Sequence, residues 1–294
     1  MSDSENMLLA KLDTFGDVAA EDDAVLDYFV ATNAVERISK KQVFLVLGRK
    51  GTGKTAIVRF FTESESKTSK ALNLRGYPWN VHASRIDHGA SDIEAYVSSW
   101  RYLIAVEFAV LALKQPSAWR SSAAENLEKF LKENYGGLEP ALADILRPPR
   151  LKLTKLSLSP SIMGNQLGGI DLDRSRGDTS FGFELNALTQ SIMESVDTVL
   201  KDIGSQPISL HFDELDQGIT TLDESRSKML VGLILATREI NRETSKSKSP
   251  VHPVIYLRSD IWEDLNFSDK NKISETLTLR LEWNSSSLNE LVQT

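Results

Sequence analysis

The sequence predicts an α/β fold in which helices cover both faces of a mostly parallel sheet. Short apolar runs, such as residues 43–47 and 208–212, alternate along the chain with longer stretches whose apolar residues recur at helical spacing. Strands that alternate with helices generally pair in parallel, and the connecting helices then bury both faces of the sheet.

The expected elements follow in order along the chain. Strands are expected at residues 43–47, 80–86, 208–212, 254–257 and 276–283, and helices at 55–61, 90–113, 183–203 and 223–242. Trp100, within the second helix, is expected in the core. Leucines from Leu151 to Leu158 approach a period of two before a glycine-rich turn, which predicts a β-hairpin within residues 147–173.

We interpret residues 1–294 as one domain with an insertion. Its parts are expected to be a helical lead-in (1–41), a first core segment (42–90), inserted helices and a β-hairpin (91–206), and a second core segment (207–294). More chain lies between the two core segments than a minimal core of this kind needs, which indicates the insertion.

Composition excludes several classes of protein. With 41% hydrophobic and 26% charged residues the chain is neither disordered nor collagen-like. A net charge of −7 argues against a surface that binds nucleic acid over its whole extent. The absence of cysteine excludes disulfides and thiolate metal sites, and makes the cytoplasm the expected compartment. No signal peptide or membrane span is expected, since Glu107 interrupts the longest apolar stretch.

The most specific motif follows the first expected strand. Residues 48–55 read GRKGTGKT and match the phosphate-binding pattern G-x-x-x-x-G-K-[ST]. The glycines let backbone N–H groups converge on a phosphate, and the following helix adds the positive end of its dipole. Lys54 is expected to neutralise the β- and γ-phosphates, and the Thr55 hydroxyl to coordinate Mg²⁺. The expected nucleotide-binding residues are Gly48, Arg49, Lys50, Gly51, Thr52, Gly53, Lys54, Thr55 and Ala56.

Two carboxylates follow the apolar run at 208–212. Asp213 is the expected metal-side ligand, and Glu214 is placed to activate a water molecule as a general base. An ordinary acidic strand end is the alternative interpretation. Asp216 is a third carboxylate in the same turn, with or without a role. His211 is expected to be a hydrogen-bonded histidine beside the sheet rather than a ligand.

A basic residue closes the next expected strand. Arg258 could reach the γ-phosphate as a catalytic cation, or it could pair with Asp260 or another surface carboxylate.

Together these motifs resemble the AAA+ and STAND group of P-loop ATPases. GRKGTGKT is similar to its Walker A loop, LHFDE to its Walker B strand, and YLRSD to its sensor-1 strand. The resemblance implies a three-layer P-loop NTPase sandwich that binds ATP and Mg²⁺ within a homo-oligomer or a larger complex. FGDVAAEDD, YFVATNAVERI and the Walker A loop are also similar to little-characterised bacterial P-loop ATPases, some of which accompany anti-phage defence genes.

The sequence departs from this group in two ways. The small helical lid that follows the core in AAA+ proteins is absent from these residues, so we expect it to be supplied elsewhere. The segment before the last expected strand contains no arginine that could act across a subunit interface, but it carries Lys270 and Lys272. Either a lysine substitutes, as a poorer cation that lacks the guanidinium fork, or the protein has no cation that acts across an interface.

Other functions remain open or are disfavoured. A switch that binds nucleotide without hydrolysing it and recruits an effector is the main alternative, and a P-loop kinase is a further one. The guanine-reading pattern Asn-Lys-x-Asp fails at Ser274, and no LSGGQ-like signature is present. Adenine is therefore favoured by exclusion.

A basic segment could contact a partner. Residues 147–176 contain six basic and two acidic residues. This segment could bind nucleic acid or an acidic protein, or it could be a solvated edge ribbon blunted by charge.

Overall fold

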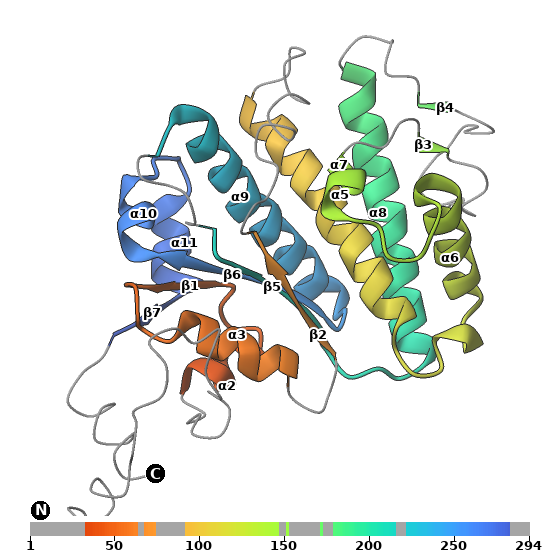
Figure 1. Cartoon of the computed structure of the whole chain (residues 1–294), viewed down its shortest axis with the longest axis horizontal. Coiled ribbons are helices and arrows are strands. Elements are labelled where there is room, and N and C mark those ends of the chain that lie inside the picture. Colours follow the sequence, from red (N-terminus) through yellow and green to blue (C-terminus); the bar gives the residue numbers. More distant parts are fainter. Residues whose placement is uncertain are drawn as a thin grey trace, which may run out of the picture.

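A five-stranded parallel sheet organises the chain (Figure 1). The computed structural model describes residues 33–63, 68–74, 92–146, 151–152, 171–172, 179–215 and 222–282. The strands are β1 (Leu45–Gly48), β2 (Ser69–Asn73), β5 (Ile208–Asp213), β6 (Val251–Arg258) and β7 (Thr278–Leu281), in the spatial order β2-β5-β6-β1-β7. All four neighbouring pairs are parallel, which confirms the expected α/β class.

Helices cover both faces of this sheet. Helices α2 (Asn33–Ser39) and α3 (Lys54–Glu63) pack on one face, against Val46, Val254 and Tyr256. Helices α9 (Glu224–Ser247), α10 (Ser259–Asp264) and α11 (Lys270–Thr276) pack on the other face, whose apolar cluster includes Leu45 and Ile255. The division follows from strand geometry, because successive residues of a strand point to opposite faces.

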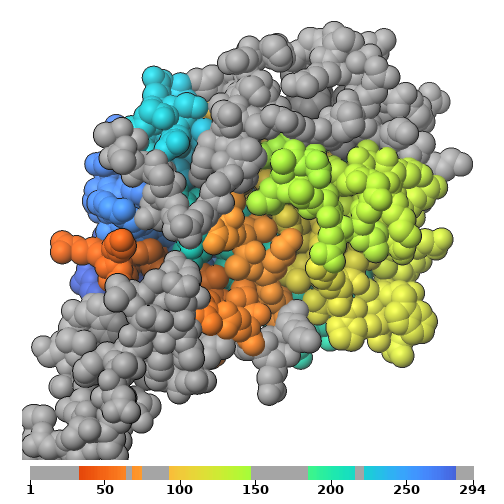
Figure 2. Space-filling model, viewed as in Figure 1, coloured from red at the N-terminus to blue at the C-terminus, as the bar shows by residue number. Residues whose placement is uncertain are grey.

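The inserted helices extend the second face sideways. They are α5 (Asp92–Leu113), the 3₁₀ turn η2 (Ala118–Arg120), α6 (Ser122–Tyr135), α7 (Leu142–Leu146) and α8 (Thr179–Asp202). Helix α5 packs between α9 and α8, and α6 packs on α8. In Figure 2 the yellow-green part of the insertion lies on the opposite side of the molecule from the blue α10 and α11 region.

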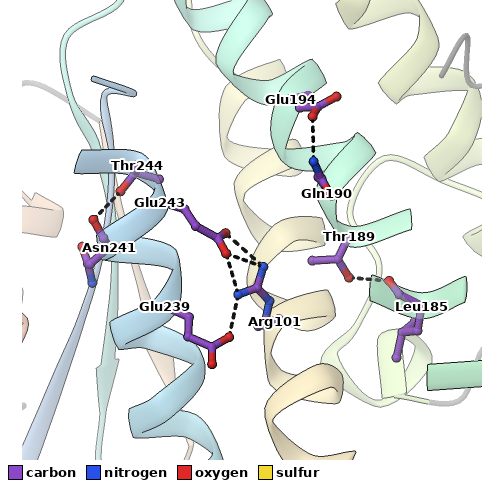
Figure 3. Close-up of polar contacts among 9 residues, drawn as sticks. All are labelled: Arg101, Leu185, Thr189, Gln190, Glu194, Glu239, Asn241, Glu243 and Thr244. Atoms are coloured by element: carbon purple, nitrogen blue, oxygen red, sulfur yellow. Dashed lines mark hydrogen bonds and ion pairs between the residues drawn. The ribbon is translucent and has the colours of Figure 1, made fainter. Parts of the chain in front are cut away.

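Helix α5 joins the insertion to the sheet. Trp100 is fully buried, as expected, and its indole N–H donates to the Met229 carbonyl of α9 at 3.0 Å. The Arg101 guanidinium binds two α9 carboxylates, Glu239 at 2.7 Å and Glu243 at 2.9 Å (Figure 3). The apolar cluster that α5 enters is continuous with the sheet core.

The same helix is the one candidate membrane span within the described residues. Residues Ile93–Leu113 are long and apolar enough to cross a membrane, but most of this stretch is buried inside the protein. Glu107 within it is buried and accepts from Lys70 of β2 at 2.5 Å. Burial raises the pKa of Glu107, and Lys70 opposes that rise. Helix α5 is therefore a core helix of this fold.

The structure extends several expected elements, and it adds strand β2 and helices α10 and α11, which were not expected. Strand β6 begins three residues earlier than expected. The expected start was late because Pro253 normally argues against a central strand. Strand β2 was missed because its sequence SKALN buries only Leu72. The strand expected at 80–86 lies outside the described residues. Strands β3 (Leu151–Lys152) and β4 (Asp171–Leu172) form the expected antiparallel pair.

Close packing of α5 on α9 depends on a glycine. A Cβ added at Gly232 of α9 would lie 2.5 Å from the Cβ of Tyr96 of α5. We therefore expect Gly232→Ala to lower the free energy of unfolding by about 1–3 kcal/mol and the melting temperature by roughly 2–10 °C. Gly137→Ala is the control, because an added Cβ there would meet nothing within 4 Å. Equal melting temperatures for the two variants would contradict this account.

Candidate functional site

The GRKGTGKT loop connects the buried strand β1 to helix α3, as the motif predicts. Gly51 and Gly53 have positive φ angles of 81° and 89°, which favour glycine. Gly48 is required for a different reason, since a Cβ there would lie 2.2 Å from the Thr52 hydroxyl oxygen. The three glycines therefore permit a tight turn in which the Gly48 backbone lies close to the Thr52 side chain.

Hydrogen bonds hold the loop closed. The Thr52 hydroxyl donates to the Arg49 carbonyl at 2.8 Å. Lys54 Nζ donates to the carbonyls of Gly48 and Arg49, both at 3.0 Å. The lysine side chain is thus folded back onto the start of its own loop. Arg49, Lys50 and Gly51 are exposed, whereas Thr52, Gly53, Lys54, Thr55 and Ala56 are half-buried.

The acidic side of the site lies at the end of β5. Asp213 is the last residue of the strand and Glu214 follows it, with relative exposures of 6% and 7%. Buried carboxylates persist in proteins where they are paired, hydrogen-bonded or bound to metal. Glu214 has a φ of 56°, uncommon for a residue other than glycine, so the chain turns sharply there.

Strand β6 lies between the loop strand and the acidic strand. Its last residue, Arg258, is the Cα partner of Gly48, so loop, arginine and carboxylates occupy the same edge of the sheet. Here β1 continues into α3 on one face, and β6 into α10 on the other. Open parallel sheets commonly bind ligands at the carboxyl ends of strands whose connections diverge in this way.

Arg258 also makes the ion pair that the alternative interpretation expected. Its Nε donates to Asp260 Oδ1 at 3.0 Å, and its Nη2 contacts Oδ2. This guanidinium lowers the pKa of Asp260. A phosphate oxygen at the sheet edge would compete with Asp260 for the same donors.

A hydrogen-bond chain, half-buried at Ser69 and Ser209 and fully buried at His211 and Tyr256, runs along the face of the sheet that α3 covers. Ser69 of β2 contacts Ser209 of β5 at 2.7 Å, Ser209 contacts His211 Nε2 at 2.9 Å, and His211 Nδ1 contacts the Tyr256 hydroxyl at 2.9 Å. Phe61 of α3 stacks on the imidazole, with ring centroids 4.9 Å apart. Burial, and to a smaller extent His252, lower the pKa of His211 to about 3. The expectation of a hydrogen-bonded histidine is confirmed.

Two polar residues near the site were missed from the sequence. Asn73, the last residue of β2, is the Cα partner of Asp213. Tyr256 lies on β6, and its pKa is raised first by burial and then by the charge of Asp213. Asn73 and Tyr256 could have been recognised as neighbours of the site only from the order of the strands in the sheet. Asp216 lies outside the described residues.

The two lysines considered for action across an interface differ in the structure. Lys270 Nζ donates to the carbonyls of Glu263 and Leu265, at 2.9 and 2.7 Å, and lies over the Trp262 ring. It therefore ties the start of α11 to the end of α10. Lys272 has a side chain that is 77% exposed, 3.8 Å from Asp269.

The residues fit a magnesium–nucleotide ligand. Mg²⁺ in such sites is held by one or two protein oxygens together with phosphates and water, and Thr55 and Asp213 supply a hydroxyl and a carboxylate. Within the described ranges no group of three or more histidines and acidic residues could hold a metal by itself.

Comparisons with known proteins give one distant similarity. The chain is 25% identical over 292 residues to a protein of Escherichia coli (strain K12) named as a transposon gamma-delta protein of 80.3 kDa. The alignment covers 94% of this chain and 38% of that protein, so the chain spans well under half of its relative. No family model matches the sequence, and no solved structure matches it.

Proposed function

We propose that this chain is a magnesium-dependent P-loop module of the AAA+/STAND type that binds ATP and hydrolyses it. The observation that supports this proposal is the shared sheet edge. The GRKGTGKT loop, with Lys54 folded over it, is separated from Asp213 and Glu214 only by β6 and its terminal Arg258. Its three-layer arrangement of helices, sheet and helices fits a P-loop sandwich.

Each residue at this edge has a proposed task. The loop N–H groups and Lys54 bind the phosphates, and Thr55 and Asp213 hold Mg²⁺, which neutralises phosphate charge when bound. Glu214 accepts a proton from the attacking water, and Arg258 offsets negative charge on the transferred group. The remaining loop residues, Gly48 to Gly53 and Ala56, shape the binding turn.

Two other functions use the same binding site. A static switch would bind nucleotide through Lys54 and recruit an effector without turnover, and a kinase would pass the phosphoryl group to another molecule. Glu214 favours hydrolysis, since a buried carboxylate directly after the metal-side aspartate suits a general base for water. Multiple-turnover release of phosphate separates the hydrolase from both.

Nucleotide binding is tested by thermal stability. We expect ATP and ADP with Mg²⁺ to raise the melting temperature, because a ligand that binds only the folded state stabilises it. At 100 times its dissociation constant the gain is about 2.7 kcal/mol. GTP should give a smaller shift. A larger rise in melting temperature with GTP than with ATP would overturn the preference for adenine. No rise with any nucleotide would contradict the proposal that the chain binds nucleotide.

We further propose that the module works in a homo-oligomer or a larger complex, in which Lys272 of one subunit serves the site of another. Specific ATPase activity should then rise with protein concentration. Mixing inactive Lys54→Ala subunits with Lys272→Ala subunits should restore some turnover, because one interface pairs an intact loop with an intact lysine. If specific ATPase activity does not change with protein concentration and the mixed subunits regain no turnover, a self-contained monomeric switch is favoured.

The wider setting is also a proposal. The similarity to a protein named for a transposon, and the resemblance to ATPases near anti-phage defence genes, favour a role in managing mobile or foreign DNA in the cytoplasm. The basic segment 147–176, most of which lies outside the described residues, would contact nucleic acid or an acidic partner.

A further inference from the structure

We propose that Asp260 is a positioning residue that holds Arg258 away from the phosphates until a γ-phosphate displaces it, so that this ion pair lowers the affinity for ATP and not for ADP. The inference rests on the proposed function and deepens it, since it assigns the arginine a resting partner before ATP binds. Asp260 itself would not touch nucleotide. It would act only through the Arg258 guanidinium.

Arg258 lies where one cation can serve either the loop or α10. It is the last residue of β6 and the Cα partner of Gly48, the first residue of the GRKGTGKT loop. Val254 and Tyr256 of the same strand pack in the apolar cluster that α3 covers. The backbone at Arg258 is still extended, so its side chain continues this alternation and leaves the strand on the face of α3.

The arginine is already engaged by a carboxylate. Its Nε donates to Asp260 Oδ1 at 3.0 Å and its Nη2 contacts Oδ2, so both carboxylate oxygens face the guanidinium. Paired contacts of this kind fit the guanidinium fork better than a single contact does. A phosphate oxygen that approached the same N–H groups would have to displace Asp260.

The pair is placed for exchange. The side chains of Arg258 and Asp260 are 32% and 59% exposed, and ion pairs this open to water contribute little to stability. The pKa of the Asp260 carboxyl is lowered first by Arg258 and to a smaller extent by hydrogen bonds from the backbone N–H groups of Asp260 and Ile261. The carboxylate therefore keeps these backbone donors and water as partners when the arginine leaves.

The two nucleotides differ in whether they break this pair. In the proposed function Arg258 offsets charge on the transferred γ-phosphoryl group, so ATP gains the contact only after displacing Asp260. ADP has no γ-phosphate and leaves the pair in place. Removing the carboxylate would make the arginine available in advance, and a protein held ready for its ligand binds that ligand more tightly.

The test removes the charge of the carboxylate and keeps its size. Asp260→Asn should tighten binding of a non-hydrolysable ATP analogue about two- to fivefold, the scale of an exposed ion pair, and should leave the affinity for ADP unchanged. In an Arg258→Ala background the same substitution should alter neither affinity, because no arginine remains to be released. A merely structural role for Asp260 would change both affinities, or would act in that background as well.

Asp264→Asn is the matched control. Asp264 is the last residue of the same helix and is exposed, so this variant removes the same charge from the opposite end of α10. Its affinity for the ATP analogue should equal that of wild type. Equal tightening by both variants would trace the effect to net charge near an anionic ligand, and would overturn the inference. Asp260→Ser, which keeps a residue favoured at helix starts, serves if Asp260→Asn does not fold.

The outcomes separate the inference from the proposed function. If wild type binds ATP but neither Asp260→Asn nor Asp260→Ser tightens that binding, the positioning role is overturned while the nucleotide site stands. Weaker binding of ATP by both variants would overturn it too, because Asp260 would then hold the arginine ready for the phosphate. If wild type binds no nucleotide, the proposed function fails, and the inference fails with it.

Discussion

Replacing Lys54 with alanine is expected to abolish ATP binding at concentrations that saturate the wild type. The ammonium group is held against the loop by bonds to the Gly48 and Arg49 carbonyls, whereas Arg49 and Lys50 are exposed. Its loss removes the cation that is expected to neutralise the β- and γ-phosphates within the loop. Equilibrium binding of a fluorescent ATP analogue measures the effect directly.

Lys246→Ala is the control for this variant. Lys246 carries the same charge, but it lies in the last turn of α9, outside the loop, and it is exposed. Binding of the ATP analogue by Lys246→Ala should stay close to wild type. If the two variants lost affinity equally, the effect would come from the net charge of the molecule, and the specific role of Lys54 would be refuted.

Replacing Glu214 with glutamine should leave ATP binding intact and slow hydrolysis by about 10²-fold or more, the scale of a lost general base. Glutamine has nearly the same shape, so the buried position after Asp213 and its unusual backbone angle can be kept. The amide cannot accept a proton from water at neutral pH. Phosphate release over many turnovers, with saturating ATP, gives the rate.

Glu224→Gln controls for loss of an acidic charge near the same strand-to-helix connection. Glu224 lies in the first turn of α9 with a side chain that is 83% exposed, and this variant should turn over as wild type does. Hydrolysis by Glu214→Gln at the wild-type rate would refute the assignment of Glu214 as the general base.

The parts of the fold that the sequence predicted are those encoded locally. The GRKGTGKT loop is specified by glycines whose φ angles or close contacts favour glycine, and β5 is indicated by the apolar residues Ile208, Leu210 and Phe212. The helices α5, α8 and α9 were found because their apolar periodicity extends over many turns.

The parts that escaped prediction depend on contacts between distant segments. Strand β2 is polar because it lies at the edge of the sheet, next to β5 only, and Pro253 is accommodated in β6 although it cannot donate a ladder bond. The neighbours of Asp213, namely Asn73 and Tyr256, follow from strand order and register. Nothing in a linear pattern states which strands will be adjacent.

The burial of α5 has a consequence for how the molecule opens. Its residues from Trp100 to Ala112 supply one apolar cluster shared by the sheet and the inserted helices, so neither part retains a covered core without the other. Loosening of the insertion alone would expose the interior of the sheet to water. Backbone amides in the middle of α5 should therefore exchange with solvent deuterium only through global unfolding, together with those of β5 and β6.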